Sequence, residues 1–235
     1  MKKLILYFIL LLIPTFSYEQ AGYNTSLQFK GTESALYTDF VPKFNTRPIE
    51  LKGTRYFNEE FAHGELWLTS DRHYGTELLY KYDEYGNTVL IKFKNGKELY
   101  LPSNDIKKFK LFLEKDTLVF FRTEIPTDKS KERLFLIMYS TPKYKLIKLP
   151  IKKLRTVNDK IPYGSGEIYD ELKSDYHYYL KIGNEEFSEV TISKKSLLKA
   201  FPKRKVQLKK IFDTPQYKKI NEGNFTEILQ QLEIM

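Results

Sequence analysis

Short runs of alternating apolar and polar residues recur along most of the chain, and turn-forming residues separate them. The clearest example is ELLYKYDEYGNTVLIKFKNGKELYL at residues 77–101, which predicts three successive β-strands. Residues 83–87 would join the first two strands. Asn95 and Gly96 would join the second and third, because both tolerate the positive φ angles of a two-residue type I′ turn.

A two-residue loop fixes which residues of the predicted hairpin face one another. In this register Ile91 lies opposite Tyr100, and residues directly opposite share a face of the sheet. Pro102 should end the third strand because proline has no backbone N–H. The face expected to point into the core carries Val89, Ile91, Phe93 and Tyr100.

Further runs rich in β-branched and aromatic residues predict more strands on either side of this meander. They recur every eight to twelve residues, which is typical of all-β architectures. The predicted fold class is mainly β, an antiparallel meander forming a sandwich, roll or open barrel, with a short C-terminal helical segment. The additional strands are expected at residues 64–69, 106–113, 117–123, 133–139, 144–149, 176–182 and 187–192.

The pattern changes at residues 150–175, where two prolines and a Gly-Ser-Gly sequence predict a long connection. We expect a short helical turn within it, at residues 167–172. Beyond the last strand the apolar spacing becomes helical. The predicted helices cover residues 194–200 with Ser193 as the N-cap, residues 204–212, and residues 225–233 with Asn224 as the N-cap.

The first 18 residues have the pattern of a cleavable secretory signal peptide. Lys2 and Lys3 precede ten apolar residues, and Ser17 offers a small residue for cleavage. A membrane anchor is the alternative, but ten apolar residues are too few to span a bilayer core of about 30 Å. The sequence therefore predicts export, to the periplasm, the outer envelope or the extracellular space.

The mature chain divides into three predicted regions. An extended N-terminal arm, low in pattern, covers residues 19–55 and contains one expected strand at residues 34–40. An antiparallel β domain follows at residues 56–192. The helical cap occupies residues 193–235.

Composition excludes several classes of site. The chain of 235 residues contains no cysteine, which excludes disulfides, thiolate catalysis and cysteine-ligated zinc. Its formal net charge is +9, and a positive surface attracts polyanions. No phosphate-binding glycine loop or dinucleotide fingerprint occurs, so we expect no cofactor.

Two basic clusters are the candidate binding residues. The first consists of Lys143, Lys145, Lys148, Lys152, Lys153 and Arg155, and the second runs from Lys194 to Lys210, with Lys203, Arg204 and Lys205 at its centre. In an exported protein they would bind anionic lipid headgroups, acidic glycans or extracellular nucleic acid. Lysine predominates over arginine, which disfavours bidentate phosphate recognition. The alternative is a solvated, lysine-rich surface without a ligand.

Two other functions remain open from the sequence. Asp71 and His73 could serve a hydrolase, although no GxSxG nucleophile motif accompanies them. Exposed tyrosines around Trp67, the single tryptophan, could form a carbohydrate-binding face. The spacing of His63, His73 and His177 gives no support for a metal site.

The chain also resembles known proteins in two places. YKYDEYGN at residues 80–87 is similar to one unit of the YD-type repeats of large bacterial surface and toxin proteins. The order LLYKYD, IKKFKLF, RLFLIMYS…YKLIKL and YYLKIG…ISKKSLLKAFPKRK resembles small exported β-rich proteins of unknown function common in Bacteroidota. This resemblance implies a periplasmic or outer-envelope location and no catalytic residues. The leading hypothesis is a non-enzymatic binding or scaffolding protein that contacts an anionic envelope component or another envelope protein.

Overall fold

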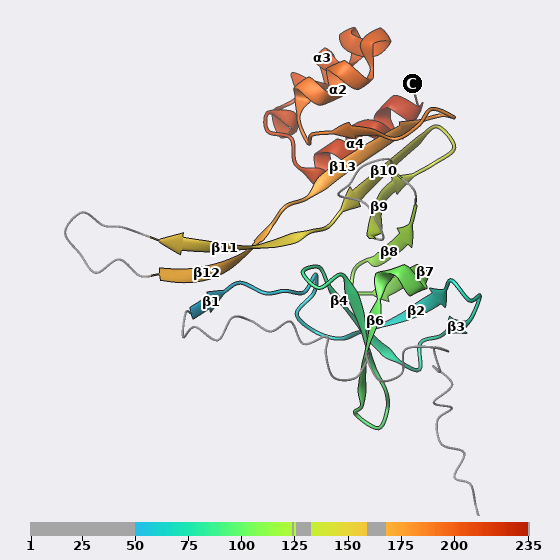
Figure 1. Ribbon diagram of the computed structural model, residues 1–235. Helices are drawn as coiled ribbons and strands as arrows, with labels where there is room; N and C mark the ends of the chain where they lie inside the picture. The colour runs from blue at the N-terminus through green and yellow to red at the C-terminus, as the bar shows by residue number, and fades with distance from the viewer. Residues whose placement is uncertain (1–49, 124, 126–132, 159–167, 235) are drawn as a thin grey trace, which may run out of the picture.

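The computed structural model describes residues 50–123, 125, 133–158 and 168–234 (Figure 1). The strands of this part are β1 (Glu50–Lys52), β2 (Ala62–Leu68), β3 (His73–Tyr74), β4 (Leu79–Asp83), β5 (Thr88–Lys92), β6 (Glu98–Pro102), β7 (Ile106–Phe112), β8 (Thr117–Arg122), β9 (Leu134–Ser140), β10 (Tyr144–Leu149), β11 (Lys152–Asn158), β12 (Ile168–Ser174), β13 (His177–Ile182) and β14 (Ser188–Val190). The helices are the 3-10 helices η1 (Ser103–Asp105), η2 (Pro202–Arg204) and η3 (Pro215–Tyr217) and the α-helices α2 (Lys194–Ala200), α3 (Lys205–Phe212) and α4 (Glu222–Ile234).

Most of the strands form one large antiparallel sheet. Its order among the described strands is β14-β13-β10-β9-β8-β7-β2-β4-β5-β6, with β3 paired to β2. The order has two ends, β14 and β6, so the sheet is open. The predicted fold class, mainly β with a C-terminal helical segment, is confirmed.

The β5–β6 hairpin closes through three residues rather than two. The Phe93 N–H donates to Lys97 O at 2.9 Å, and the Gly96 N–H donates to Phe93 O at 2.9 Å. Gly96 has φ +81°, the left-handed conformation that follows the turn in a three-residue hairpin loop. The predicted two-residue turn is therefore wrong.

The extra loop residue shifts the pairing by one position and exchanges the faces of the third strand. Ile91 lies opposite Leu99 rather than Tyr100. Leu99 and Leu101 are buried, whereas Tyr100 is half-buried on the other face. The predicted core face is wrong at Tyr100, and the end of the strand at Pro102 is confirmed.

The predicted connection at residues 150–175 is instead a strand pair in its described part. β11 and β12 pair in antiparallel register from Lys152–Ser174 to Asn158–Ile168, and β1 adds to β12 in parallel. They continue the β10–β13 pair, so a long ribbon leaves the main sheet and projects from the body (Figure 1). The predicted helical turn at residues 167–172 is wrong for residues 168–172, because pairing with β11 overrides the local preference.

Two hydrophobic clusters occupy the ends of one sheet face. The first packs aromatic and aliphatic side chains of β2 and β4–β9, including Phe109 and Phe120 with stacked rings 4.4 Å apart. The second joins β10, β13 and β14 to the helices. A third, smaller cluster includes Phe135 and Tyr179, whose ring centroids are 5.9 Å apart.

The helices cover the end of the sheet formed by β10, β13 and β14. In Figure 1, α4 lies between the strands and the α2–α3 pair. The Ser193 N-cap of α2 is confirmed, since its side chain accepts from the Ser196 N–H. The cap predicted for the last helix is wrong: Asn221, three residues before Asn224, accepts from the Asn224 N–H at 2.8 Å, so the helix begins a turn earlier.

The predicted leader at residues 1–18 and the predicted strand at residues 34–40 lie outside the described residues. Residues 50–55 of the predicted arm lie within the described part, and they include β1, a strand that precedes the predicted domain boundary at residue 56. In the part that the structure describes, no helix has both the length and the apolar character required to cross a bilayer.

Candidate functional site

The positive charge of the chain is concentrated in one helical segment. Residues 193–221 contain ten lysine or arginine residues and one acidic residue, Asp213, a net charge of +9. The whole chain has the same net charge, so the other residues balance with 29 basic and 29 acidic side chains. The segment spans α2, η2, α3 and η3, so the excess charge belongs to the outer helices.

Eight of these cations are exposed, and we call them the lysine layer. Across the described ranges, none of the eight forms an ion pair with an acidic side chain. Their charge therefore faces solvent and is not neutralised by an acidic side chain of the described residues. The lysine layer consists of Lys195, Lys199, Lys203, Lys205, Lys209, Lys210, Lys218 and Lys219.

Three other basic residues contact backbone carbonyl oxygens at the C-terminal ends of helices. Lys143 Nζ donates to Glu233 O at 2.8 Å, and Arg204 contacts Leu232 O, both at the C-terminus of α4. Lys194 Nζ lies 3.4 Å from Phe212 O at the C-terminus of α3. Cations at the C-terminal ends of helices satisfy free carbonyls and complement the helix dipole. Of the second predicted cluster, Lys203 and Lys205 belong to the lysine layer, whereas Arg204 has a structural contact.

The first predicted cluster does not gather into one exposed surface. Lys148 and Lys152 are buried, at 6% and 8% exposure, and both have acidic partners within the fold. Lys145 is half-buried on the opposite face of β10 from Lys148, with Nζ 4.3 Å above the Phe121 ring. Burial, together with the nearby Lys181, lowers the pKa of Lys145.

The last two members of that cluster are exposed on the projecting ribbon. Lys153 forms an ion pair with Asp175, and Arg155 lies opposite Glu171 in the β11–β12 register. Both therefore have acidic neighbours that reduce their local field. In the described part of the chain, no hydrogen bond or ion pair joins this cluster to the lysine layer, and Lys143 contacts the C-terminal end of α4.

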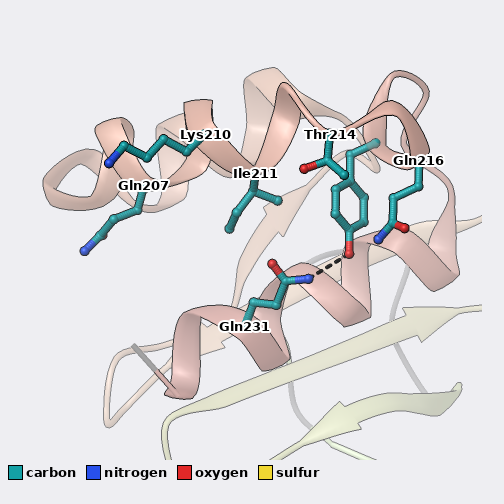
Figure 2. A pocket seen from close by; sticks show the side chains of 7 residues that line it. Gln207, Lys210, Ile211, Thr214, Gln216 and Gln231 are labelled. Atoms are coloured by element: carbon teal, nitrogen blue, oxygen red, sulfur yellow. Dashed lines mark hydrogen bonds between the residues drawn. The ribbon is translucent and has the colours of Figure 1, made fainter.

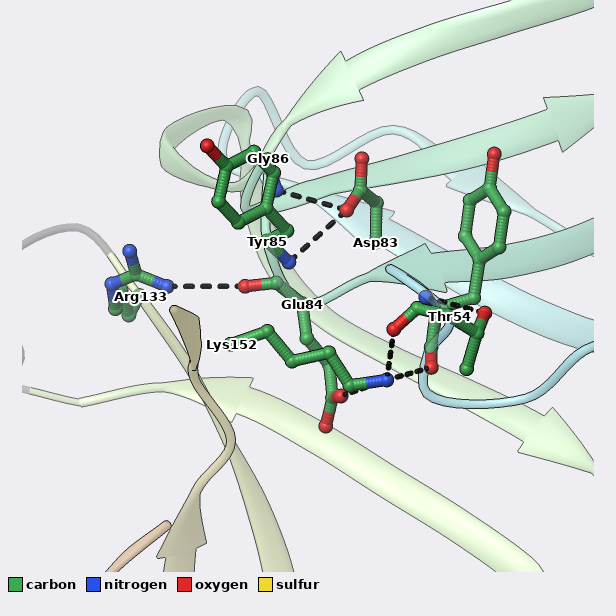
Figure 3. A network of polar contacts seen from close by, with 8 residues as sticks. Thr54, Asp83, Glu84, Tyr85, Gly86, Arg133 and Lys152 are labelled. Atoms are coloured by element: carbon green, nitrogen blue, oxygen red, sulfur yellow. Dashed lines mark hydrogen bonds and ion pairs between the residues drawn. The ribbon is translucent and has the colours of Figure 1, made fainter. Parts of the chain in front are cut away.

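Lys152 instead belongs to a buried polar network where the ribbon meets the first half of the sheet (Figure 3). Its Nζ donates to Thr54 O at 2.6 Å and Tyr56 O at 2.8 Å, and lies 3.2 Å from Glu84 Oε2. Glu84 is 0% exposed, and the Lys152 ammonium is its cationic partner. Burial raises the pKa of Glu84, while Lys152 opposes the shift.

The turn that carries Glu84 is stabilised by its neighbour Asp83. Asp83 Oδ1 accepts from the Tyr85 and Gly86 N–H groups at 3.1 and 2.9 Å, and Oδ2 pairs with Arg55. These contacts explain the YDEYGN sequence as turn chemistry. The contacts of Asp83 therefore fix the turn from which the Glu84 side chain reaches Lys152.

Lys148, the other buried lysine, pairs with a carboxylate of the helices. Its Nζ lies 3.0 Å from Glu222 Oε1 in the first turn of α4, and 3.7 Å above the Tyr176 ring. Tyr178 donates to the same Glu222 oxygen at 2.6 Å. A carboxylate at a helix N-terminus is favoured by the helix dipole. The two buried lysines thus join the sheet to α4 and to the β4–β5 turn, and they are not available to an external anion.

A groove lies beside the lysine layer, between α3 and α4 (Figure 2). Three glutamines, a threonine and one lysine of the layer line it, above an apolar floor. Gln231 Nε2 donates to the Tyr217 hydroxyl at 2.8 Å, which donates to Glu227 Oε2 at 3.2 Å. Its lining includes Gln207, Lys210, Ile211, Thr214, Gln216 and Gln231.

The alternative catalytic pair lies in an exposed turn between β2 and β3. Asp71 has φ 60° and pairs with Lys107 at 3.1 Å, while His73 stacks on Trp67 with ring centroids 4.6 Å apart. Trp67 is half-buried, and His73 covers one of its faces. The partner of Asp71 is a lysine rather than His73, so this geometry offers no base–orienter pair.

Among the described residues, no group of three or more His, Asp or Glu side chains is arranged to hold a metal ion. No protein-family model, curated protein or solved structure matches this chain. The resemblances found in the sequence therefore stay predictions.

Sequence reasoning missed the acidic partners and the groove. Glu84 and Glu222 are distant in sequence from Lys152 and Lys148, so no local pattern pairs them. The groove depends on Gln207 and Gln231 from different helices. Helix periodicity places Gln231 beside the apolar stripe of α4, and that is the one sequence signal pointing toward the groove.

Proposed function

We propose that this protein is an exported, non-enzymatic binding protein of the cell envelope whose lysine layer binds an anionic polymer. The observation that carries the proposal is the concentration of the entire net charge of the chain, +9, in residues 193–221. A domain that needed charge only for solubility would gain equally from lysines spread over its surface. The export part of the proposal rests on the signal-peptide pattern of residues 1–18.

The chemistry of the lysine layer favours an extended polyanion. All eight members are lysines, which act as mobile point charges, whereas arginine provides the fixed geometry for binding one phosphate or carboxylate. Many exposed ammonium groups on adjoining helices attract a polymer through its summed charge. Selectivity for one polyanion over another would have to come from other groups near the lysine layer.

Binding of dextran sulfate, with uncharged dextran as the reference polymer, tests the proposal. Affinity should fall steeply as salt rises, because exposed charges are screened over a Debye length of about 10 Å at 0.1 M salt. The variant K205Q/K209Q/K210Q should bind more weakly and with a shallower salt dependence. Absence of dextran sulfate binding, or binding that salt does not weaken, would overturn the proposal.

A matched variant controls for the loss of three charges. Lys94, Lys97 and Lys115 are exposed in turns outside the helical segment. K94Q/K97Q/K115Q lowers the net charge equally, so it separates a local binding surface from general attraction. It should retain nearly the affinity and salt dependence of the wild type.

A further inference from the structure

The groove between α3 and α4 combines charge with neutral hydrogen-bonding groups. Lys210 belongs both to the lysine layer and to the groove, so a ligand in the groove meets a member of the layer. Within the described part of the chain, the side chains of Gln207, Thr214 and Gln216 make no hydrogen bond to the protein, and all three are exposed. They are free to bind a ligand.

The orientation of the Gln231 amide follows from its neighbours. The Tyr217 hydroxyl has one proton, which it donates to Glu227 Oε2 at 3.2 Å. It must therefore accept from Gln231, whose Nε2 lies 2.8 Å away. This contact directs the Gln231 amide nitrogen to Tyr217 and leaves its carbonyl oxygen as an acceptor on the groove side (Figure 2).

A ligand that fits must donate and accept hydrogen bonds and also carry negative charge. The oxygens of sulfate esters and phosphodiesters only accept, so they leave the Gln231 carbonyl oxygen without a donor. Sugar hydroxyls both donate and accept, as do the amides of Gln207 and Gln216 and the hydroxyl of Thr214. A carboxylate on the same sugar would meet the Lys210 ammonium.

We propose that this groove binds an acidic oligosaccharide, with sugar hydroxyls on the glutamine amides and a sugar carboxylate at Lys210. The proposal rests on the proposed function, and it names the chemical class of the polymer that the lysine layer binds. The layer supplies charge attraction to any polyanion. The groove supplies selection for a polymer made of sugar acids.

Calorimetric titration of the purified protein with tetra-galacturonate tests this site. Wild-type protein should bind it at least tenfold more tightly than N-acetyl tetra-glutamate amide, which carries the same number of carboxylates without sugar hydroxyls. The variant Q207A/Q231A should lose about tenfold in affinity for tetra-galacturonate, as expected for two lost hydrogen bonds. Its affinity for dextran sulfate should stay within about twofold, because its charge is unchanged.

Gln230 provides the matched control, since it neighbours Gln231 on α4 but is exposed outside the groove lining. Q230A should bind tetra-galacturonate like the wild type. If Q207A/Q231A is poorly folded, Q207A alone, at an exposed position, should still lose about threefold in affinity.

Two results would overturn the groove site: equal affinity of the wild type for the two tetramers, or unchanged tetra-galacturonate binding by both Q207A/Q231A and Q207A. If dextran sulfate binding persists, only the groove proposal fails. If the wild type binds neither dextran sulfate nor tetra-galacturonate, the proposed function fails with it.

Discussion

Lys152 Nζ lies 3.2 Å from Glu84 Oε2, and both side chains are buried. Glu84 belongs to the turn between β4 and β5, and Lys152 begins β11, so the pair joins two parts of the fold that are distant in sequence. A buried pair of this kind costs desolvation energy that its attraction only partly offsets. Loss of Lys152 alone, which leaves the Glu84 carboxylate buried without its cation, is therefore expected to be the costly change.

Lys152→Met should lower the free energy of unfolding by roughly 3 kcal/mol, because Glu84 would remain as an unpaired buried charge. Glu84→Gln should change it by less than about 1 kcal/mol, because Lys152 keeps two backbone acceptors, Thr54 O and Tyr56 O. K152M/E84Q should be more stable than K152M. Urea denaturation of all four proteins at neutral pH measures the coupling energy. Equal stability of K152M and K152M/E84Q would show that the two charges are not coupled.

The stability of Glu84→Gln relative to the wild type should depend on pH. Burial raises the pKa of Glu84 in the folded protein, with Lys152 opposing the shift. The proton then binds more tightly to the folded than to the unfolded chain, and this contribution is complete below the unfolded pKa and lost as pH rises through the folded pKa. E84Q lacks the titration, so its stability relative to wild type should increase from about pH 4 to neutral pH.

Asp175→Asn provides a control with the opposite sign. The hydrogen bond from Lys153 lowers the pKa of Asp175, so its contribution is present above the unfolded pKa and lost as pH falls through the folded value. D175N should therefore lose stability relative to wild type at neutral pH and recover it in acid. Urea denaturation across the same pH range measures both variants, and parallel trends would contradict the assignment.

Arg204 and Lys205 are adjacent, yet they should differ in their roles. Arg204→Gln should cost about 1 kcal/mol in unfolding free energy, because Arg204 contacts Leu232 O at the C-terminus of α4. Lys205→Gln should cost less than about 0.5 kcal/mol at its exposed position, and should weaken dextran sulfate binding more than R204Q does. Denaturation and binding measurements on both variants test this division. A destabilised K205Q with wild-type binding would reverse it.

Much of the fold could be predicted because its signals are local. Tyr144–Leu149 is a strand and Lys194–Ala200 is a helix at the predicted bounds, since alternation, a cap and a following proline mark them. The β5–β6 register could not be predicted from Asn95 and Gly96 alone. The same dipeptide suits a two-residue or a three-residue loop, and one residue of difference exchanges the faces.

The candidate site could likewise be predicted only in part. The exposure of Lys203 and Lys205 could be predicted because they belong to a run of cations without acids on short helices. Lys148 and Lys152 were predicted on the same ground and are buried, because their acidic partners come from remote segments. A run of basic residues in the sequence therefore predicts an exposed basic surface only where no carboxylate from a distant segment pairs with those residues.

Lysine acetylation in the presence and absence of dextran sulfate, read by mass spectrometry, tests the central claim most directly. The polymer should protect Lys205, Lys209 and Lys210 and leave Lys94 and Lys97, which are also exposed, reactive. Uniform protection of all five lysines, or protection of Lys94 and Lys97 alone, would contradict a binding surface on the outer helices.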